Sequence, residues 1–254
     1  MGRYDGILIM TDMDGTLASG GVVTEENVAA IRRFQSEGGR FTVCSGRHSS
    51  HFEKFRDLFL PNAPICAYNG ALIVDTDGNI ISESFLGEDA LAIALMAVKR
   101  DLFARVLLYT RENGAPTTCE TGDFISNFGK YRIMHHYKIV LVGKTEEATL
   151  LGREFMKENL PESYVAVRSW PVGLEILNSN ATKDKALTFL RSYTAARLVI
   201  AAGDFENDIE MLRVADVGYA VDNADPEVKD AADRITVRVD ESAIAKIIEE
   251  LDCN

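Results

Sequence analysis

The chain has 254 residues, of which 46% are apolar and 26% are charged, a composition typical of a globular protein that buries a full core. Its 27 Lys and Arg against 39 Asp and Glu give a net charge of −12, which argues against nucleic-acid binding because that function needs a basic face. No apolar run approaches the roughly 20 residues that cross a bilayer, and the first residues do not form a signal peptide, so we expect no membrane partner.

The two ends of the chain alternate short apolar runs with amphipathic helical patterns. After the first run, a helix is expected over residues 25–37, where Thr24 can cap the first turn and Gly38-Gly39 can end the last one. Strands are expected at 7–10, 41–44, 65–68, 198–202 and 217–221, and further helices at 183–193, 207–214, 226–232 and 241–251. This alternation predicts an α/β core, a doubly wound, Rossmann-like parallel sheet with helices on both faces.

The middle of the chain has a different pattern. Strands expected at 71–74 and 80–85 flank Thr76-Asp77-Gly78-Asn79, a sequence typical of a hairpin turn. Beyond it we expect helices at 88–102 and 146–159, strands at 105–109, 137–142, 164–168 and 174–177, and an irregular stretch up to about residue 136. Consecutive strands predict an antiparallel sheet with helices on one face. We therefore predict a core domain of residues 1–85 and 179–254 and an inserted α+β domain of residues 86–178.

The four cysteines are too far apart in the sequence to suggest a metal site or a redox pair. Cys44 and Cys66 lie inside apolar runs, which is typical of buried thiols. Free thiols favour a reducing compartment, so we expect a cytoplasmic protein.

Acidic side chains follow the apolar runs of the core, where the carboxyl ends of parallel strands meet and ligands bind. Asp12 and Asp14 alternate along an extended segment, so both can face one site. Neighbouring carboxylates repel each other unless a cation or a proton lies there, and an oxygen-only site suits Mg²⁺. Asp204 and Asp208 form a second acidic group between a buried strand and a helix, although helix capping is a competing explanation for Asp208.

Three further positions have side chains suited to an anion site. Ser45-Gly46-Arg47 follows a strand with a hydroxyl, a glycine and exposed amides that can cradle an anion, although Ser-Gly is also a common turn. Asn69 follows the next apolar run in the same way. Lys183 begins a predicted helix, where a cation is unfavourable, and this placement indicates a function.

These residues resemble the haloacid dehalogenase-like phosphohydrolases, most closely subclass IIB, whose α/β cap lies between the second and third motifs. The four motifs of the family occur in order as Asp12-Met13-Asp14-Gly15-Thr16-Leu17, Ser45-Gly46-Arg47, Lys183 and Gly203-Asp204-Phe205-Glu206-Asn207-Asp208. Two of the departures from the family's pattern lie at these motifs, and a third lies near the C-terminus, where Asp240-Glu241-Ser242-Ala243-Ile244 lacks a glycine pair that is often seen there. Ser45 stands where many relatives have threonine, and Asp184 follows Lys183 where relatives often have glycine, which makes Lys185 a rival for the lysine role.

The resemblance implies a Mg²⁺-dependent reaction that passes through an aspartyl-phosphate. Asp12 is the implied nucleophile, and Asp14 is the implied group that protonates the leaving alcohol and then activates water. The resemblance also implies that Mg²⁺ is held by Asp12, the main-chain carbonyl of Asp14, Asp204, and Asp208, the last directly or through water. The cation offsets the repulsion between an anionic nucleophile and an anionic phosphate.

The remaining site residues are implied by the same resemblance. Lys183 belongs to the catalytic set. The groups expected to hold the phosphoryl oxygens are Ser45, Gly46, Lys183 and Asn207. The residues expected near the rest of the substrate are Arg47, Asn69 and Glu175. For Glu175, an ordinary charge on the strand surface is an equal alternative.

The implied activity is hydrolysis of a small phosphorylated metabolite, with a sugar phosphate as the expected substrate and the insert as the domain that selects it. Two alternatives stay open: a phosphomutase of the phosphomannomutase type, and a non-catalytic regulatory protein that binds phosphate.

Overall fold

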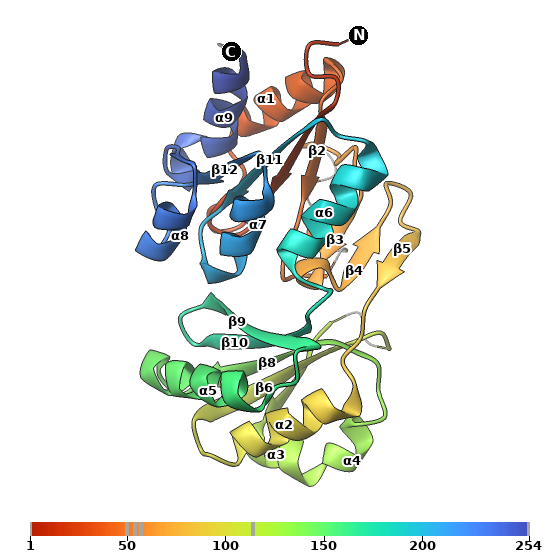
Figure 1. The fold of residues 1–254 in the computed structure, drawn as a ribbon, viewed down its shortest axis with the longest axis vertical. Helices are drawn as coiled ribbons and strands as arrows, with labels where there is room; N and C mark the ends of the chain where they lie inside the picture. The colour runs from red at the N-terminus through yellow and green to blue at the C-terminus, as the bar shows by residue number, and fades with distance from the viewer. Residues whose placement is uncertain (1, 49–50, 53–54, 56–57, 113–114, 253–254) are drawn as a thin grey trace. The chain divides into compact units, whose positions relative to one another are not determined.

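The computed structural model describes residues 2–48, 51–52, 55, 58–112 and 115–252. The chain divides into two compact units (Figure 1). The core unit consists of Met1–Ile81 and Lys183–Asn254, and the inserted unit consists of Ser82–Thr182. The insert expected from the sequence, residues 86–178, lies within the inserted unit.

The core unit is built on a parallel sheet whose strands lie in the order β13-β12-β11-β1-β2. These strands are β1 (Ile7–Thr11), β2 (Arg40–Val43), β11 (Leu198–Gly203), β12 (Val217–Ala220) and β13 (Arg234–Ile235). Ile9 of β1 pairs with Ile200 of β11 on one side and with Phe41 of β2 on the other. The strand order reverses between β1 and β11, and such a reversal marks the edge where ligands of open sheets bind.

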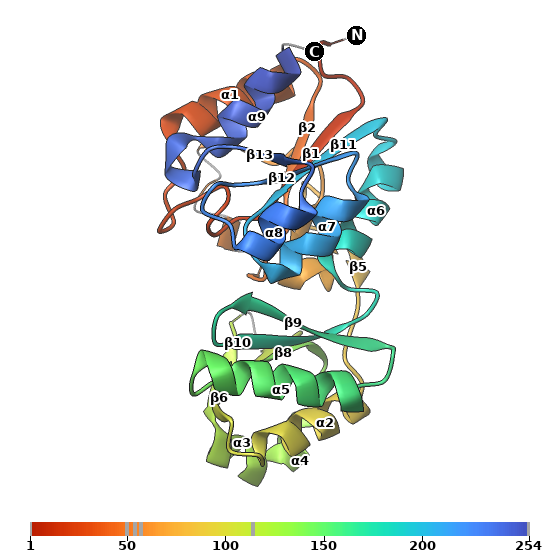
Figure 2. The ribbon, with the colours of Figure 1, turned by 60° about the vertical axis from the view of Figure 1, so that its left-hand side comes forward.

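Helices cover both faces of this sheet (Figure 2). They are α1 (Glu25–Ser36), α6 (Lys183–Thr194), α7 (Ile209–Val214), α8 (Pro226–Ala231) and α9 (Ala243–Asp252). Helices α1 and α9 pack on the face that holds Ile9, and α6, α7 and α8 pack on the face that holds Leu8 and Met10. Because successive strand residues point to opposite faces, β1 supplies both cores. The doubly wound α/β core predicted from the sequence is confirmed.

The third apolar run does not join the parallel sheet, contrary to expectation. It forms β3 (Ile65–Ala67), in a separate sheet with β4 (Leu72–Val74) and β5 (Ile80–Glu83), and β3 and β4 are antiparallel. An isolated bridge between Cys44 and Cys66 links β3 to the end of β2. The expected hairpin at residues 71–85 is therefore present, but as part of this second sheet.

Backbone conformation explains why β3 is short. Tyr68 and Asn69, directly after it, have φ angles of 51° and 62°, in the left-handed region, so the chain turns there instead of extending the strand. Strand β13 was not expected, because its two exposed residues are too few for a periodic pattern.

The cysteines of the core behave as expected. Cys44 and Cys66 are buried and form no disulfide within the described part of the chain, and Cys119 of the inserted unit is buried in the same state. Cys253 lies outside the described residues.

The inserted unit is an antiparallel sheet in the order β7-β6-β8-β10-β9, with helices α2, α3, α4 and α5 on one face (Figures 1 and 2). The strands are β6 (Phe103–Thr110), β7 (Thr117–Glu120), β8 (His136–Gly143), β9 (Tyr164–Trp170) and β10 (Gly173–Asn178). The helices are α2 (Glu88–Val98), α3 (Thr121–Ser126), α4 (Phe128–Tyr131) and α5 (Glu146–Asn159). The α+β architecture predicted for the insert is confirmed.

Two expectations for the inserted unit are wrong. The helix expected to reach residue 102 ends at Val98, because Asp101 has a φ of 61° and turns the chain into β6. The stretch expected to be irregular up to residue 136 contains β7, α3 and α4. Phe124 and Tyr131 anchor this stretch, with both side chains buried and their stacked rings 5.9 Å apart. The helical spacing of apolar residues here is masked by polar neighbours in the sequence.

The packing of α5 against β6 leads to a test of this unit's core. A Cβ added at Gly152 would lie 2.3 Å from Cζ of Phe103, whose ring is fully buried. We expect Gly152→Ala to lower the midpoint of thermal unfolding, measured by scanning calorimetry. Overpacking costs about 1–3 kcal/mol, whereas alanine in a helix is only about 1 kcal/mol more favourable than glycine.

The matched control is Gly122→Ala in α3. No described atom lies within 4 Å of a Cβ added there, so the same exchange should leave the midpoint unchanged or raise it. Equal midpoints for the two variants would contradict the packing argument.

Candidate active site

Three carboxylates meet at the carboxyl edge of the core sheet. Asp12 directly follows β1, Asp204 directly follows β11, and Asp208 closes the short 3₁₀ helix Glu206–Asp208 before α7. One carboxylate oxygen from each lies within 4.8 Å of the other two. The main-chain N–H of Asp12 donates to the carbonyl of Ala202 at 2.9 Å, so the pairing of β1 with β11 continues into the site.

Asp208 is held in place by backbone donors. One of its carboxylate oxygens accepts hydrogen bonds from the N–H of Asp204 at 3.0 Å and of Phe205 at 3.2 Å. The capping role considered for Asp208 is therefore present, and its carboxylate belongs to the acidic cluster as well.

Lys183, the first residue of α6, provides the positive charge of the cluster. Its Nζ donates to Oδ1 of Asp12 at 2.5 Å and to Oδ1 of Asp208 at 2.7 Å, and the side chain is buried. Lys185, the rival in the sequence, is 56% exposed and pairs with Asp184. The structure thus brings Lys183, and not Lys185, to the carboxylates, and a helix N-terminus tolerates this cation because two anions face it.

The cluster is strongly coupled electrostatically. Burial raises the pKa of Asp12 to about 7, aided by the charge of Asp208 and opposed by Lys183. Burial likewise raises the pKa of Asp204 to about 8, aided by the charges of Asp12 and Asp208. Burial alone would lower the pKa of Lys183, but the charges of Asp12 and Asp208 outweigh it and raise that pKa. One lysine therefore does not compensate three carboxylates, of which Asp12 and Asp208 are buried and Asp204 is partly buried.

Two side chains that the sequence analysis did not single out support the cluster. The hydroxyl of Thr16 donates to Oδ1 of Asp204 at 2.8 Å, and Nδ2 of Asn223 donates to the carbonyl of Gly15 at 2.8 Å. Gly15 has a φ of 89°, and a Cβ added there would lie 2.3 Å from Oδ2 of Asp204. Thr16 lies inside the first motif and Asn223 at the end of a predicted strand, but only the folded chain shows what they contact.

Asp14 lies outside the three-carboxylate cluster. Arg47 donates to it twice, from Nε to Oδ2 at 2.5 Å and from Nη2 to Oδ1 at 2.9 Å. Their side chains are half exposed, at 50% for Arg47 and 44% for Asp14. Arg47, which we expected near the substrate, therefore forms an ion pair with Asp14, which we expected to act as acid and base.

The loops after β2 and β3 meet beside the cluster. Ser45 is buried, its hydroxyl accepts from the N–H of Arg47 at 3.3 Å, and its carbonyl accepts from the N–H of Asn69 at 2.9 Å. Nδ2 of Asn207 donates to Oδ1 of Asn69 at 3.4 Å. Gly46 lies partly exposed in the same loop. Residues from three parts of the sequence are thereby brought together.

Glu175 lies on β10 of the inserted unit. Nζ of Lys138 on β8 donates to both of its carboxylate oxygens, at 2.8 and 2.9 Å. The alternative of an ordinary charge on the strand surface is wrong, because the residue is only 1% exposed. Lys138 is a further candidate that sequence reasoning missed, since its partner depends on strand register.

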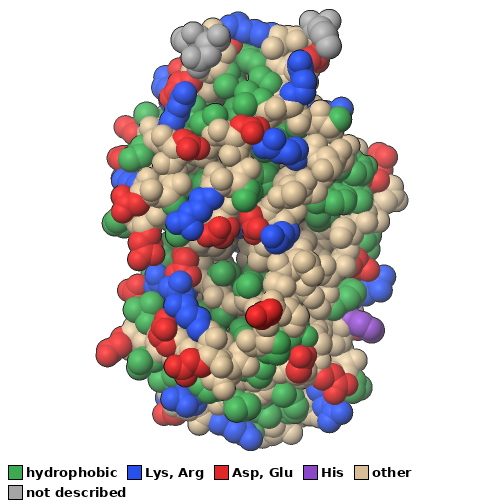
Figure 3. Space-filling model, viewed as in Figure 1, with side chains coloured by type: hydrophobic (Ala, Val, Ile, Leu, Met, Phe, Trp, Pro, Cys, Tyr) green, Lys and Arg blue, Asp and Glu red, His purple; other side chains and the backbone are tan. Residues whose placement is uncertain are grey.

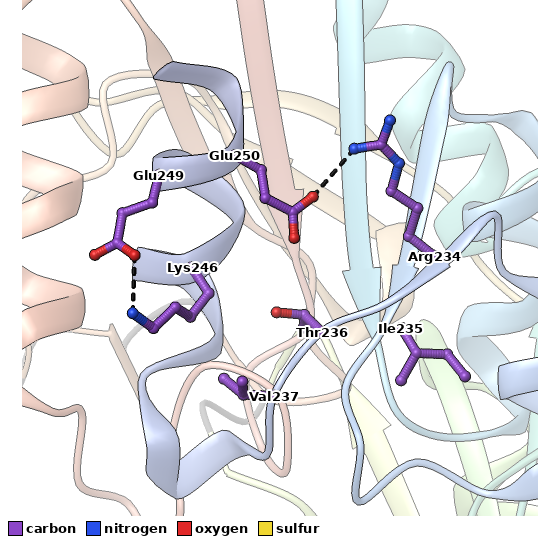
Figure 4. Close-up of a pocket in the computed structure, with 7 residues that line it drawn as sticks. All are labelled: Arg234, Ile235, Thr236, Val237, Lys246, Glu249 and Glu250. Carbon is purple, nitrogen blue, oxygen red and sulfur yellow. Dashed lines mark hydrogen bonds and ion pairs between the residues drawn. The ribbon is translucent and has the colours of Figure 1, made fainter. Parts of the chain in front are cut away.

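A separate pocket of about 680 Å³ lies between β13 and α9 (Figure 4). Its charged side chains pair with one another, Arg234 with Glu250 and Lys246 with Glu249. None of the clustered carboxylates lines it. The pocket is therefore distinct from the acidic cluster.

The surface and the helices show two further features. On the face shown in Figure 3, Lys and Arg side chains are interspersed with Asp and Glu and form no extended basic patch. Within the described residues, none of the helices has the length and apolar character needed to cross a membrane.

Known proteins are similar to this chain in sequence and in fold. The family of haloacid dehalogenase-like hydrolases matches residues 9–248. YxeH of Bacillus subtilis, whose name assigns a phosphatase activity provisionally, is 30% identical over 266 residues, covering 96% of this chain and 97% of that protein. The 5-amino-6-(5-phospho-D-ribitylamino)uracil phosphatase YwtE of Bacillus subtilis is 27% identical over 281 residues, with 96% and 97% covered.

Solved structures show the same fold. A haloacid dehalogenase-like hydrolase from Bacteroides thetaiotaomicron has a TM-score of 0.74 at 25% identity, covering 98% of this chain and 99% of that one. BT4131, described as a subclass IIB sugar phosphatase, has a TM-score of 0.78 at 19% identity, with 97% and 99% covered. This chain belongs to the haloacid dehalogenase-like hydrolases. The names of its relatives support a phosphatase enzyme, and its fold is shared with BT4131.

The close approach of Gly15 to Asp204 leads to a test of the cluster. We expect Gly15→Ala to lower phosphatase activity on p-nitrophenyl phosphate by about tenfold or more, because the new Cβ would displace a clustered carboxylate. Steady-state phosphate release measures the loss.

Gly20→Ala separates this contact from backbone strain. Gly20 also has a positive φ, of 57°, but no described atom lies within 4 Å of a Cβ added there. The Gly20→Ala variant should therefore unfold at a lower temperature without a comparable loss of phosphatase activity. Activity losses of the same size in both variants would show that backbone strain, and not the contact with Asp204, is responsible.

Proposed function

We propose that the protein is a Mg²⁺-dependent phosphatase that hydrolyses a small phosphorylated metabolite, a sugar phosphate, through an aspartyl-phosphate. The observation that carries this proposal is the largely buried cluster of Asp12, Asp204 and Asp208 with Lys183 at the carboxyl edge of the core sheet. It combines a nucleophile with the charges needed to bind a phosphoryl group.

The residues of the cluster fit a magnesium ion. They supply carboxylate oxygens, the hard donors that Mg²⁺ prefers. Burial, together with neighbouring carboxylates, raises the pKa values of Asp12 and Asp204, and a divalent cation would favour the charged form of both groups. Asp12, Asp204 and the main-chain carbonyl of Asp14 would hold the ion, with Asp208 binding directly or through water. When bound, Mg²⁺ neutralises charge on the phosphate and the nucleophile.

The protein residues perform the reaction in two steps. An oxygen of Asp12 attacks phosphorus, the bond from phosphorus to the ester oxygen breaks, and Asp14 gives its proton to the departing alcohol. Asp14 then takes a proton from water as that water attacks phosphorus and releases Asp12. The ion pair with Arg47 holds the carboxylate of Asp14 in a defined orientation.

Other side chains bind the phosphoryl oxygens and the substrate. In the proposal, Lys183, the hydroxyl of Ser45, the N–H groups around Gly46 and the amide of Asn207 hold the phosphoryl oxygens. Asn69 links two of these residues, since its N–H donates to the carbonyl of Ser45 and its Oδ1 accepts from Nδ2 of Asn207, and these contacts support the role. Arg47 orients Asp14, and Asn69 holds the two loops together.

The inserted unit selects the substrate in this proposal, with Glu175 among its contacts. The names of relatives support a phosphorylated polyol or sugar as the substrate class. YwtE, YitU and YcsE of Bacillus subtilis are all named for a phosphatase acting on 5-amino-6-(5-phospho-D-ribitylamino)uracil. BT4131 is described as a sugar phosphatase.

The nucleophile is tested with Asp12→Asn. The variant keeps the shape of the side chain but not its attacking oxygen, so we expect phosphate release to fall by about a thousandfold or more. EDTA should abolish the activity of the unmodified enzyme, and added Mg²⁺ should restore it. Glu249→Gln, which removes a carboxylate on α9, is the control and should retain activity.

The products of this assay separate the candidate reactions. Free phosphate from a sugar phosphate identifies a phosphatase, whereas an isomeric sugar phosphate identifies a mutase. Full activity of Asp12→Asn, or of the chelated enzyme, would refute the proposed mechanism.

Asp14 is tested through the leaving group. Asp14→Asn should lose far more activity on glucose 6-phosphate than on p-nitrophenyl phosphate, because a nitrophenolate departs without needing a proton. Values of kcat/KM for both substrates measure the difference. If the two substrates lose the same factor, Asp14 does not protonate the leaving group.

A further inference from the structure

The turn that follows β12 contacts both loops that carry the proposed magnesium ligands. Nδ2 of Asn223 in this turn donates to the carbonyl of Gly15 at 2.8 Å. Two residues further on, the N–H of Asp225 donates to the carbonyl of Asp204 at 3.1 Å. Asp204 and the main-chain carbonyl of Asp14, the residue before Gly15, are ligands in the proposed function. The turn therefore connects the segments on which two of the ligands lie.

Gly15 is the residue of the first loop whose backbone can rotate most freely. Its φ of 89° lies in the left-handed region, which glycine enters at little cost because it has no side chain. The same property lets the peptide groups on either side of Gly15 rotate relative to each other. One of those groups contains the carbonyl of Asp14. Contacts to both peptide groups are therefore needed to keep that carbonyl in a single orientation.

Both peptide groups beside Gly15 are held by hydrogen bonds. The first group contains the carbonyl of Asp14 and the N–H of Gly15, and this N–H donates to the carbonyl of Ala18 at 2.9 Å. A peptide group is planar and trans, so its carbonyl points away from its N–H. The second group contains the carbonyl of Gly15, which accepts from Asn223. Asn223 thus restricts the rotation that the glycine would otherwise allow.

The other end of the Asn223 amide is anchored in the core unit. Its Oδ1 accepts from the N–H of Val239 at 2.8 Å, and Val239 is a buried residue that begins the short 3₁₀ helix Val239–Glu241. The side chain therefore donates to one backbone group and accepts from another. An asparagine can make both bonds, whereas aspartate lacks the donor and alanine lacks both groups.

We propose that Asn223 is a positioning residue for magnesium binding, because it holds the carbonyl of Gly15 and thereby keeps the carbonyl of Asp14 in the orientation that binds the ion. This inference rests on the proposed function and adds to it a residue that fixes one of the ligands. Residues that orient metal ligands change metal affinity about tenfold to a hundredfold when they are removed. A residue that only stabilises the turn would change stability and leave the affinity for Mg²⁺ as it is.

The test is Asn223→Ala, with Mg²⁺ alone as the probe. An ion that binds the folded protein raises the midpoint of thermal unfolding, and the dependence on Mg²⁺ concentration gives the Kd. We expect the Kd of the variant to be about tenfold higher than that of the unmodified protein. The Mg²⁺ concentration for half-maximal hydrolysis of p-nitrophenyl phosphate should rise by a similar factor, and kcat at saturating Mg²⁺ should change far less, because excess ion offsets the weaker binding.

The matched control is Asn62→Ala, since Asn62 makes the same pair of bonds elsewhere in the core unit. Its Nδ2 donates to the carbonyl of Gly39 at 2.9 Å, and its Oδ1 accepts from the N–H of Phe41 at 2.7 Å, near the start of β2. Without Mg²⁺, both variants should unfold a few degrees below the unmodified protein. Only Asn223→Ala should bind Mg²⁺ more weakly. An equal loss of affinity in Asn62→Ala would show that lowered stability is the cause, and it would overturn the inference.

A second variant, Asn223→Asp, tests the bond to Gly15 by itself. Aspartate has the shape of asparagine and can still accept from the N–H of Val239, but it has no donor for the carbonyl of Gly15. We expect this variant to bind Mg²⁺ more weakly as well. The added negative charge alone would strengthen the binding of a cation, so a higher Kd has to come from the lost donor.

The outcomes separate this inference from the proposed function. If the unmodified protein binds Mg²⁺ and releases phosphate, but either folded variant at Asn223 binds the ion as tightly as the unmodified protein does, the positioning role is refuted and the proposed function stands. If Mg²⁺ neither stabilises the unmodified protein nor supports phosphate release, the proposed function fails, and this inference fails with it.

Discussion

Three carboxylates that repel one another lie at the carboxyl edge of the core sheet, and the other residues of the site hold them there. β1 and β11 are neighbours and end together, so the fold brings Asp12 and Asp204 to one place, and the turn before α7 adds Asp208. Lys183 offsets part of this charge through contacts of 2.5 and 2.7 Å. The charged forms of Asp12 and Asp204 remain unfavourable, since burial and the neighbouring carboxylates raise their pKa values to about 7 and about 8. A phosphatase of this family benefits from such a site, because the preorganised charge is in place before substrate arrives.

The surrounding residues hold the carboxylates against that repulsion. The hydroxyl of Thr16 fixes Asp204, and two backbone N–H groups fix Asp208. Gly15 leaves the space that Asp204 occupies. The packed interior of the core unit therefore supplies free energy that keeps like charges close, which no isolated segment of the chain could do.

Local signals made much of this architecture predictable from the sequence. Thr24 caps α1, accepting from the N–H of Asn27 at 3.3 Å, and α5 runs from Glu146 to Asn159 as expected, because caps and apolar periodicity act within one segment. The acidic residues were predictable because they follow buried strands. The pairing of Arg47 with Asp14 was not, because it depends on how two loops 33 residues apart meet. Strand register likewise determines the contact of Lys138 with Glu175, and a sequence pattern does not encode which residues of two strands align.

The place of Lys183 in the chain has a consequence for how such proteins diversify. It is the first residue of the core unit after the insert and lies 171 positions from Asp12. Its location is set by α6, whose Ala186, Leu187 and Leu190 pack in the core, and not by the length of the chain that precedes it. Since the entropy of closing a long loop grows only slowly with its length, an insert of another size or fold can replace residues 82–182 without moving the lysine. Evolution can therefore exchange the inserted unit as a module while the chemistry of the core stays constant.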